Sequence, residues 1–275
     1  MPRMDQTDEF RDPFSISPDP NMLYQTASVK AALHKVRYTI RRRQGLTSII
    51  GAVGLGKSTL VRYLFGEADA DPKIEARFIP SPNFTSEFAF LKAVSAEFGV
   101  PAKGSMLTQE NAFKEMLGDA FFQSKNVVLF VDEAQRLSNK MLEVVRAFLN
   151  FETNDRKLIQ IVLAGQLELG DRLASRANEA IASRIVMPVA LNSLTAAETR
   201  ALVEYRCAAV EAPLPFSADA WPALYEATDG IPREVLKISA AAVELMRLAE
   251  AETVTAEIIR AAALEGTARV KDDGR

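Results

Sequence analysis

A glycine-rich stretch that ends in lysine, serine and threonine, GAVGLGKST, has the residue types and the spacing that bind a phosphate chain. Its glycines let the backbone curl around a phosphate, so that N–H groups and the start of the next helix point at the anion. In this Walker A pattern Lys57 reaches the β- and γ-phosphates of a nucleotide, and Ser58 is a ligand of Mg²⁺. We therefore predict an ATP site. Its residues are Gly51, Ala52, Val53, Gly54, Leu55, Gly56, Lys57, Ser58 and Thr59.

Two adjacent carboxylates, Asp132 and Glu133, follow the apolar run NVVLFV. Such a run predicts a strand that is buried on both faces, with the carboxylates at its carboxyl end, as in a Walker B motif. Asp132 is then placed to hold the Mg²⁺ shell, and Glu133 to polarise a water for in-line attack on the γ-phosphate. The pair favours hydrolysis of ATP over transfer to a substrate hydroxyl, and over a switch that scarcely hydrolyses.

Strands and helices must alternate to bring these motifs together, and the sequence shows that alternation. The β-type runs TSII, ARFI, NVVLFV, LIQIVLA and RIVMPV are separated by helical patterns as far as Val189. This predicts an α/β fold, a parallel sheet with helices on both faces. Beyond it the pattern is helical throughout. We divide the chain into an irregular segment 1–26, a P-loop ATPase domain 27–190, an all-helical lid domain 191–267 and a tail 268–275.

Composition limits the other functions that the chain can have. It has 275 residues, with 33 basic and 36 acidic side chains and a formal net charge of -3, so binding to nucleic acid or membranes must be local. One cysteine and one histidine exclude an internal disulfide and a Cys/His zinc cluster. We find no apolar run of about 18 residues and no signal peptide, so we expect no membrane span and a cytoplasmic location.

With these motifs in order, the chain resembles the AAA+ ATPases over about residues 10–266. The segments DPFSISPDPNMLY, VLFVDEAQRLS, LIQIVLAGQLEL and DGIPREVLKIS are similar to the ExeA-type ATPases of bacterial secretion and to the related TnsC/MuB transposition regulators. The resemblance implies an ATP-hydrolysing homo-oligomer, either a ring or a filament.

The resemblance also implies roles for polar residues beyond the two motifs. Gln166 stands where the family senses the γ-phosphate, and Arg233 in GIPRE matches the family's second sensor, in the lid. Arg184 precedes the last strand, where the family's trans-acting arginine reaches the γ-phosphate of the neighbouring subunit. Arg172 and Arg176 are close alternatives, and the sequence does not decide among the three.

Two further expectations concern the surroundings of the nucleotide. Asn83 follows the second strand, at a position that in many relatives holds the catalytic glutamate inactive. Phe14 and Tyr24, in the N-terminal segment, offer flat faces that either pack near an adenine or cap the sheet.

A basic segment is the candidate contact with double-stranded DNA. The cations proposed for this contact are Lys30, Arg37, Arg41, Arg42 and Arg43, and Lys35 lies in the same segment. On a helix Lys30, Arg37 and Arg41 project from one side, and such a stripe can track phosphates when subunits stack. The alternative is a solvated helix face beside an acidic neighbour.

The family resemblance leaves two functions open. The first is an ATP-dependent regulator of DNA transposition or a related mobile-element transaction, with a transposase as partner. The second is an ExeA-like assembly ATPase that acts on a secretion or envelope component. Secretion-type relatives continue into a membrane span and a cell-wall-binding domain that this sequence does not show, so we expect the first.

Overall fold

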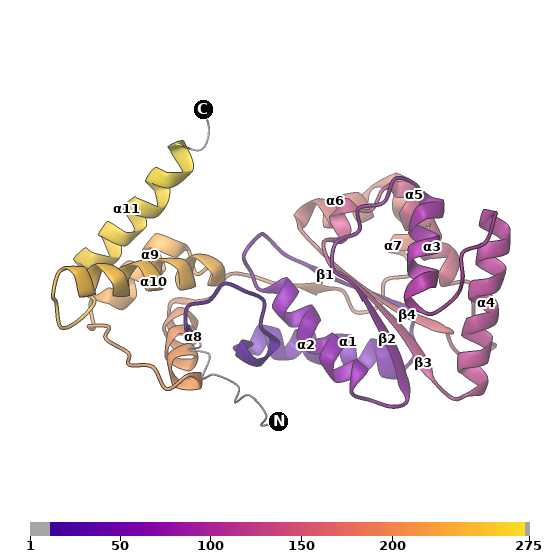
Figure 1. Ribbon diagram of the computed structural model, residues 1–275, viewed down its shortest axis with the longest axis horizontal. Coiled ribbons are helices and arrows are strands. Elements are labelled where there is room, and N and C mark those ends of the chain that lie inside the picture. The colour runs from indigo at the N-terminus through magenta and orange to yellow at the C-terminus, as the bar shows by residue number, and fades with distance from the viewer. Residues whose placement is uncertain (1–11, 273–275) are drawn as a thin grey trace, which may run out of the picture. The chain divides into compact units, whose positions relative to one another are not determined.

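The computed structural model describes residues 12–272, and side chains as far as Glu265. It confirms the predicted α/β fold with a parallel sheet, followed by a helical C-terminal part (Figure 1). The chain forms two compact units. The first comprises Asp19–Val53 and Lys57–Asn192. The second comprises Gly54–Gly56 and, among the described residues, 12–18 and 193–272.

The first unit contains a parallel sheet of five strands in the order β2-β3-β4-β1-β5. The strands are β1 (Leu46–Ile50), β2 (Ile74–Ile79), β3 (Asn126–Val131), β4 (Ile159–Gly165) and β5 (Val189–Ala190). In this order β4 lies between β1 and β3. Ile50 of β1 pairs with Gly165 of β4, and Val131 of β3 pairs with Leu163 of the same strand. The carboxyl ends of these three strands therefore lie side by side at one edge of the sheet.

Helices cover both faces of this sheet (Figure 1). They are α1 (Ala27–Arg41), α2 (Lys57–Asp69), α3 (Glu87–Glu97), α4 (Met106–Phe122), α5 (Asn139–Phe148), α6 (Leu167–Ala174) and α7 (Glu179–Ala182). Four of these helices begin at a hydroxyl that accepts a hydrogen bond from the backbone N–H three residues further on, which satisfies an otherwise unpaired donor. The hydroxyls belong to Thr26, Ser86, Ser105 and Ser138.

The core lies on the two faces of β3, whose six residues are all buried. Successive side chains of a strand point to opposite faces. On one face the ring of Phe65, from α2, packs 5.9 Å from that of Phe130. On the other face Leu129 joins a cluster that includes Phe113 of α4 and Phe148 of α5, whose rings are 4.7 Å apart. The apolar run of β3 is therefore a central strand, as its sequence predicts.

The last predicted strand, residues 184–189, is shorter than expected. Val189–Ala190 forms β5, and Ile185 adds one isolated parallel bridge to Leu46. Between them Met187 has a left-handed backbone with φ of 52°, and Pro188 has no N–H to donate to a neighbouring strand. These two residues interrupt the strand.

The second unit is helical. Its helices are α8 (Ala196–Ala209), α9 (Ala220–Thr228), α10 (Pro232–Leu248) and α11 (Ala256–Asp272). Phe14 is buried in this unit, with its ring 6.4 Å from that of Phe216. The buried Arg206 donates from Nε to the carbonyl oxygen of Pro13 at 2.8 Å, which fixes the segment that carries Phe14. Phe14 therefore packs in the core of the helical unit rather than on the sheet.

The two ends of the chain differ in part from expectation. Helix α11 continues to Asp272, so residues 268–272 of the predicted tail are helical. Residues 1–11 of the predicted irregular segment, and 273–275 of the tail, lie outside the described residues. Within residues 12–272, we find no helix that combines the length and the apolar character needed to cross a membrane.

Candidate nucleotide-hydrolysis site

The sheet brings three of the predicted motifs to one edge. The P-loop follows β1, the acidic pair follows β3, and Gln166 follows β4. The backbone N–H of Gly51 donates to the carbonyl oxygen of Gly165 at 3.3 Å, which joins the start of the P-loop to the end of β4. Because β4 lies between the other two strands, Gln166 lies between the P-loop and Asp132.

The P-loop holds its lysine inside the loop. Lys57 is buried, and its Nζ donates to the carbonyl oxygens of Gly51 at 2.8 Å and Ala52 at 2.7 Å. An ammonium group in this position is a fixed positive charge at the start of α2, where the helix dipole also favours an anion. The arrangement suits the phosphate chain of a nucleotide.

Ser58 and Asp132 meet as a pair of oxygen ligands would. The Ser58 hydroxyl is hydrogen-bonded to the Asp132 carboxylate, and Asp132 is buried. Hydroxyl and carboxylate oxygens are the donors that Mg²⁺ prefers, with phosphate oxygens and water completing its shell. These two residues would hold the ion, which when bound would neutralise charge on the β- and γ-phosphates.

The surroundings of Asp132 disfavour the ionised form of its carboxyl group. Burial raises the pKa of this carboxyl, and hydrogen bonds from Ser58 and from the backbone of Glu133 oppose the rise. When the pKa of a carboxyl is higher in the folded than in the unfolded state, the folded protein loses stability as the pH rises above the ordinary pKa of that carboxyl. The loss is complete once the pH exceeds the raised pKa. At a pH above the ordinary carboxyl range, the burial of Asp132 therefore lowers the stability of the nucleotide-free protein.

We expect Asp132→Asn to raise the melting temperature of the nucleotide-free protein by about 2 °C at pH 7, because the amide removes this cost. Thermal unfolding measured from pH 7 downward checks the prediction. The gain should shrink as the pH approaches the ordinary carboxyl range, where the wild-type carboxyl is also neutral. A lower melting temperature at pH 7 would show that the carboxylate stabilises the fold.

Glu133 has an unusual backbone and two amide donors. Its φ is 51°, in the left-handed region that side-chain-bearing residues seldom adopt. Its Oε2 accepts a hydrogen bond from Nε2 of Gln135 at 2.6 Å, and a longer one from Nε2 of Gln166 at 3.5 Å. The carboxylate is thus held between the end of β3 and the end of β4.

Gln135 belongs to this candidate site, although no motif in the sequence predicts it. Its Nε2 donates to Glu133, and its Oε1 accepts the backbone N–H of Gln166 at 3.1 Å, so one side chain connects Glu133 to the predicted sensor residue. Of the described residues, Gln135 and Gln166 donate to this carboxylate, whereas Asn83 is exposed. The sequence DEAQ does place a glutamine two residues after Glu133. The direction in which its side chain points depends on the turn Ala134–Arg136, which the sequence does not predict.

The three candidate trans-acting arginines differ in their contacts. The guanidinium of Arg172 donates to the carbonyl oxygen of Leu137. Arg184 donates from Nη1 to Oδ1 of Asn150 at 2.7 Å. Arg176 is exposed, and its side chain makes no hydrogen bond or ion pair with the residues that the structure describes. None of these contacts is with the P-loop or the acidic pair.

Arg233 lies beside the tip of the P-loop. The tip, Gly54–Gly56, belongs to the same compact unit as α10, and the backbone N–H of Arg233 donates to the carbonyl oxygen of Gly54 at 3.1 Å. A Cβ on Gly54, whose φ is 84°, would lie 2.8 Å from Cγ2 of Ile231, so this position requires glycine. The role of Arg233 as a second sensor stays a prediction.

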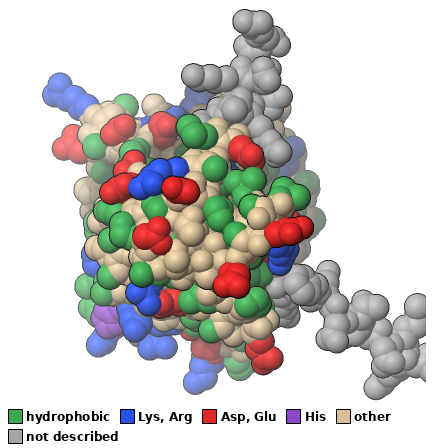
Figure 2. Space-filling model, turned by 90° about the vertical axis from the view of Figure 1, so that its left-hand side faces the viewer, with side chains coloured by type: hydrophobic (Ala, Val, Ile, Leu, Met, Phe, Trp, Pro, Cys, Tyr) green, Lys and Arg blue, Asp and Glu red, His purple; other side chains and the backbone are tan. Residues whose placement is uncertain are grey.

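The basic residues of α1 and of the turn after it differ in their contacts and exposure. Arg37 forms an ion pair with Glu67 at 2.6 Å, and Arg43 donates to the carbonyl oxygen of Lys125 at 2.8 Å. The other three cations of the predicted set, Lys30, Arg41 and Arg42, are exposed. Arg41 and Arg42 border a hollow together with His34 and Tyr38. Figure 2 shows cationic side chains gathered beside the histidine.

Comparison with known sequences identifies the class of this domain. Residues 40–173 match the model of an AAA domain. General secretion pathway protein A of Aeromonas hydrophila is 33% identical over 225 residues, which make up 80% of this chain and 40% of that protein. The chain therefore spans less than half the length of this relative.

Solved structures show the same fold. The ORC2 protein of Aeropyrum pernix superposes with a TM-score of 0.66 at 16% identity, over 94% of this chain and 72% of that one. The RuvB branch migration motor of Thermotoga maritima gives 0.58 at 16% identity, over 86% and 68%. The Aeropyrum pernix ORC1 protein, solved in complex with DNA, gives 0.61 at 15% identity, over 87% and 64%. At these identities the likeness concerns the fold alone.

Residues 40–173 are therefore an AAA domain, and together with the fold this domain identifies an ATPase, which binds and hydrolyses ATP. Within that class this chain is similar to the ExeA-type proteins, as its match to general secretion pathway protein A shows.

Proposed function

We propose that this ATPase works as an oligomer in which each nucleotide site is completed by Arg184 of a neighbouring copy. ATP held by the P-loop, with Mg²⁺ on Ser58 and Asp132, closes the contact between copies. Hydrolysis by a water that Glu133 polarises then opens it. A ring or a filament results, according to whether the head-to-tail contact closes.

The position of Arg184 at the sheet edge is the observation that carries this proposal. Ile185, the next residue, bridges to Leu46 at the start of β1, whereas the P-loop follows Ile50 at the end of that strand. Five residues of strand span roughly 16 Å. Arg184 therefore starts from the edge of the sheet that is remote from its own phosphate loop. A guanidinium there is suited to a nucleotide on another copy, where it neutralises charge in the transition state.

We propose duplex DNA as the macromolecule on which the copies assemble, in transposition or a related mobile-element transaction with a transposase as partner. The exposed cations Lys30, Arg41 and Arg42 support this, since phosphate contacts supply most of the affinity of such proteins for DNA. Because Arg37 is paired with Glu67 and Arg43 is bonded to a backbone carbonyl, we assign these two a smaller part. We keep the cytoplasm as the location, where ATP and DNA are both present.

A second candidate function is an ExeA-like assembly ATPase that acts on a secretion or envelope protein. The 33% identity to general secretion pathway protein A favours it. In that case the exposed cations of α1 form a solvated surface, and a protein partner rather than DNA raises the rate of ATP hydrolysis.

Retention of a labelled duplex, measured with a non-hydrolysable ATP analogue, separates the two functions. We expect Arg41→Glu with Arg42→Glu to weaken binding by about tenfold or more at moderate salt, because each lost phosphate contact also reverses a charge. A matched control is Lys114→Glu with Lys140→Glu, which changes the same net charge at exposed positions on α4 and α5. No retention by the wild-type protein, or equal loss in both double variants, contradicts a DNA contact through α1.

A further inference from the structure

We propose that Asn150 and the adjacent Glu152–Lys157 hairpin form a resting site for Arg184, from which the triphosphate on a neighbouring copy must remove it. The proposal rests on the proposed function, because it describes how the trans-acting arginine is restrained before copies meet. Asn150 is accordingly a positioning residue, which acts through Arg184 and touches no nucleotide.

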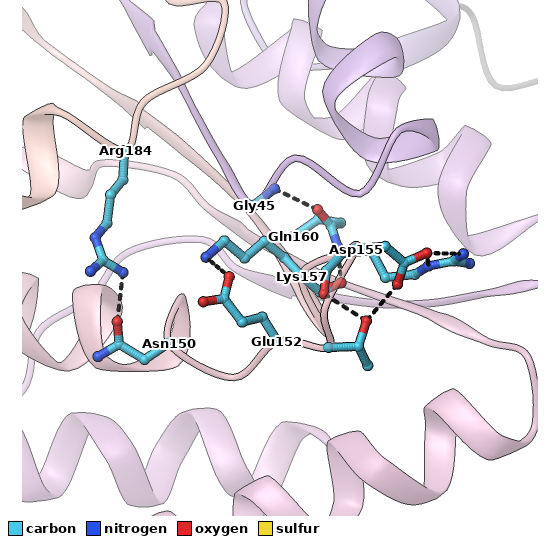
Figure 3. Close-up of polar contacts among 9 residues, drawn as sticks. Gly45, Asn150, Glu152, Asp155, Lys157, Gln160 and Arg184 are labelled. Atoms are coloured by element: carbon cyan, nitrogen blue, oxygen red, sulfur yellow. Dashed lines mark hydrogen bonds and ion pairs between the residues drawn. The ribbon is translucent and has the colours of Figure 1, made fainter.

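The guanidinium of Arg184 and the amide of Asn150 point toward each other in Figure 3, and Nη1 lies 2.7 Å from Oδ1. Glu152 lies near the same guanidinium. A hydrogen bond from Lys157 is the main cause that lowers the pKa of the Glu152 carboxyl, the charge of Lys157 contributes next, and the charge of Arg184 adds to both. Arg184 therefore rests against one amide oxygen and in the field of one carboxylate.

The fold fixes the hairpin that carries this resting site. Glu152 and Lys157 face each other in an antiparallel bridge and form an ion pair. The N–H of Lys157 donates to the carbonyl oxygen of Arg43 at 3.3 Å, and Nε2 of the buried Gln160 donates to the carbonyl oxygen of Lys157 at 3.1 Å. Oε1 of Gln160 in turn accepts the N–H of Gly45 at 2.8 Å (Figure 3). The hairpin base is thus tied to the residue before β1.

The chemistry of the acceptor makes this contact reversible. Asn150 is exposed and offers a neutral oxygen, which binds a guanidinium less strongly than a charged phosphate oxygen does. When a second copy presents a triphosphate, Arg184 therefore binds the phosphate and its hydrogen bond to Asn150 breaks. Until then the hydrogen bond holds the Arg184 side chain in one position. Breaking that hydrogen bond adds to the free-energy cost of assembly. The strength of the Asn150 contact should accordingly set how readily copies assemble into active sites.

Two substitutions at position 150 should move assembly in opposite directions. Asn150→Ala removes the acceptor, so we expect half-maximal ATPase activity at a protein concentration about two- to fivefold lower than for the wild type. Asn150→Asp replaces the amide by a carboxylate that pairs with the guanidinium, so we expect a shift of similar size to higher concentration. Asn154→Ala, at an exposed asparagine near the tip of the same hairpin, is the matched control and should leave the curve unchanged.

The same curves in an Arg184→Ala background show whether the effect passes through the arginine. There, Asn150→Ala and Asn150→Asp should leave the residual ATPase activity unchanged. Wild-type curves for both single variants, or shifts in the same direction, overturn the resting site, and so do shifts that persist without Arg184. If Arg184→Ala alone keeps the wild-type, concentration-dependent turnover, the proposed function itself is wrong, whatever position 150 does.

Discussion

Glu133→Gln is expected to lower ATP turnover by about a hundredfold or more while the protein still binds ATP. Glutamine keeps the size of the side chain but cannot take a proton from the attacking water. The P-loop and the Ser58–Asp132 pair are unchanged by the substitution, so bound ATP should persist and the copies should stay assembled. Phosphate release and size-exclusion chromatography in ATP measure the two effects.

The matched control for this substitution is Glu168→Gln, at an exposed acid in the first turn of α6. It should turn over ATP like the wild type. Wild-type turnover in Glu133→Gln would remove Glu133 from its assigned role. Loss of nucleotide binding in that variant would instead show that the carboxylate supports the binding site.

Arg184→Ala is expected to lower turnover by about a thousandfold, the lower end of what a trans-acting arginine contributes. The decisive measurement mixes this variant with Glu133→Gln, since each alone keeps only a small residual turnover. In a mixed assembly, an Arg184→Ala copy keeps Glu133 and can receive the intact arginine of its neighbour. In an equal, randomly ordered head-to-tail mixture about a quarter of the sites become complete, so about a quarter of wild-type activity should return.

Arg176→Ala and Arg172→Ala, each mixed with Glu133→Gln, are the comparisons. Arg172 is bonded to the carbonyl oxygen of Leu137 within its own subunit, so its loss should reduce thermal stability rather than create a variant that a neighbour rescues. If Arg176→Ala is inactive alone and rescued in the mixture, while Arg184→Ala is active alone, then Arg176 is the trans-acting residue. If no mixture recovers activity, the site is not shared between copies.

The strongest sequence signals fixed the parts of the site that depend on the backbone. GAVGLGKST predicted the loop between β1 and α2, and NVVLFVDE predicted a buried central strand with acids at its end. Both patterns are local, so they can be recognised without knowing which strands are neighbours in the sheet. The last strand was predicted too long because apolar periodicity does not register the left-handed Met187 or the missing N–H of Pro188.

Side-chain partners that are distant in sequence could not be predicted. Asn150 and Arg184 are 34 residues apart, and Gln135 and Gln166 are 31 apart. The local sequence around these residues does not show that the two members of each pair come together. The sheet and the helices that cover it bring them into contact. Asn83 illustrates the converse, because its position after β2 suggested a partner for Glu133 that the structure provides from Gln135 and Gln166 instead.

The backbone of Glu133 has a consequence for how this sequence changes over evolutionary time. Its left-handed conformation costs a residue with a side chain roughly 1 kcal/mol or more relative to glycine. Asp132, next to it, is a carboxylate that burial disfavours. Selection for folding alone would therefore replace both residues, with glycine and with a neutral side chain. A descendant that no longer needed to hydrolyse ATP should lose these two acids first and become more stable as it does so.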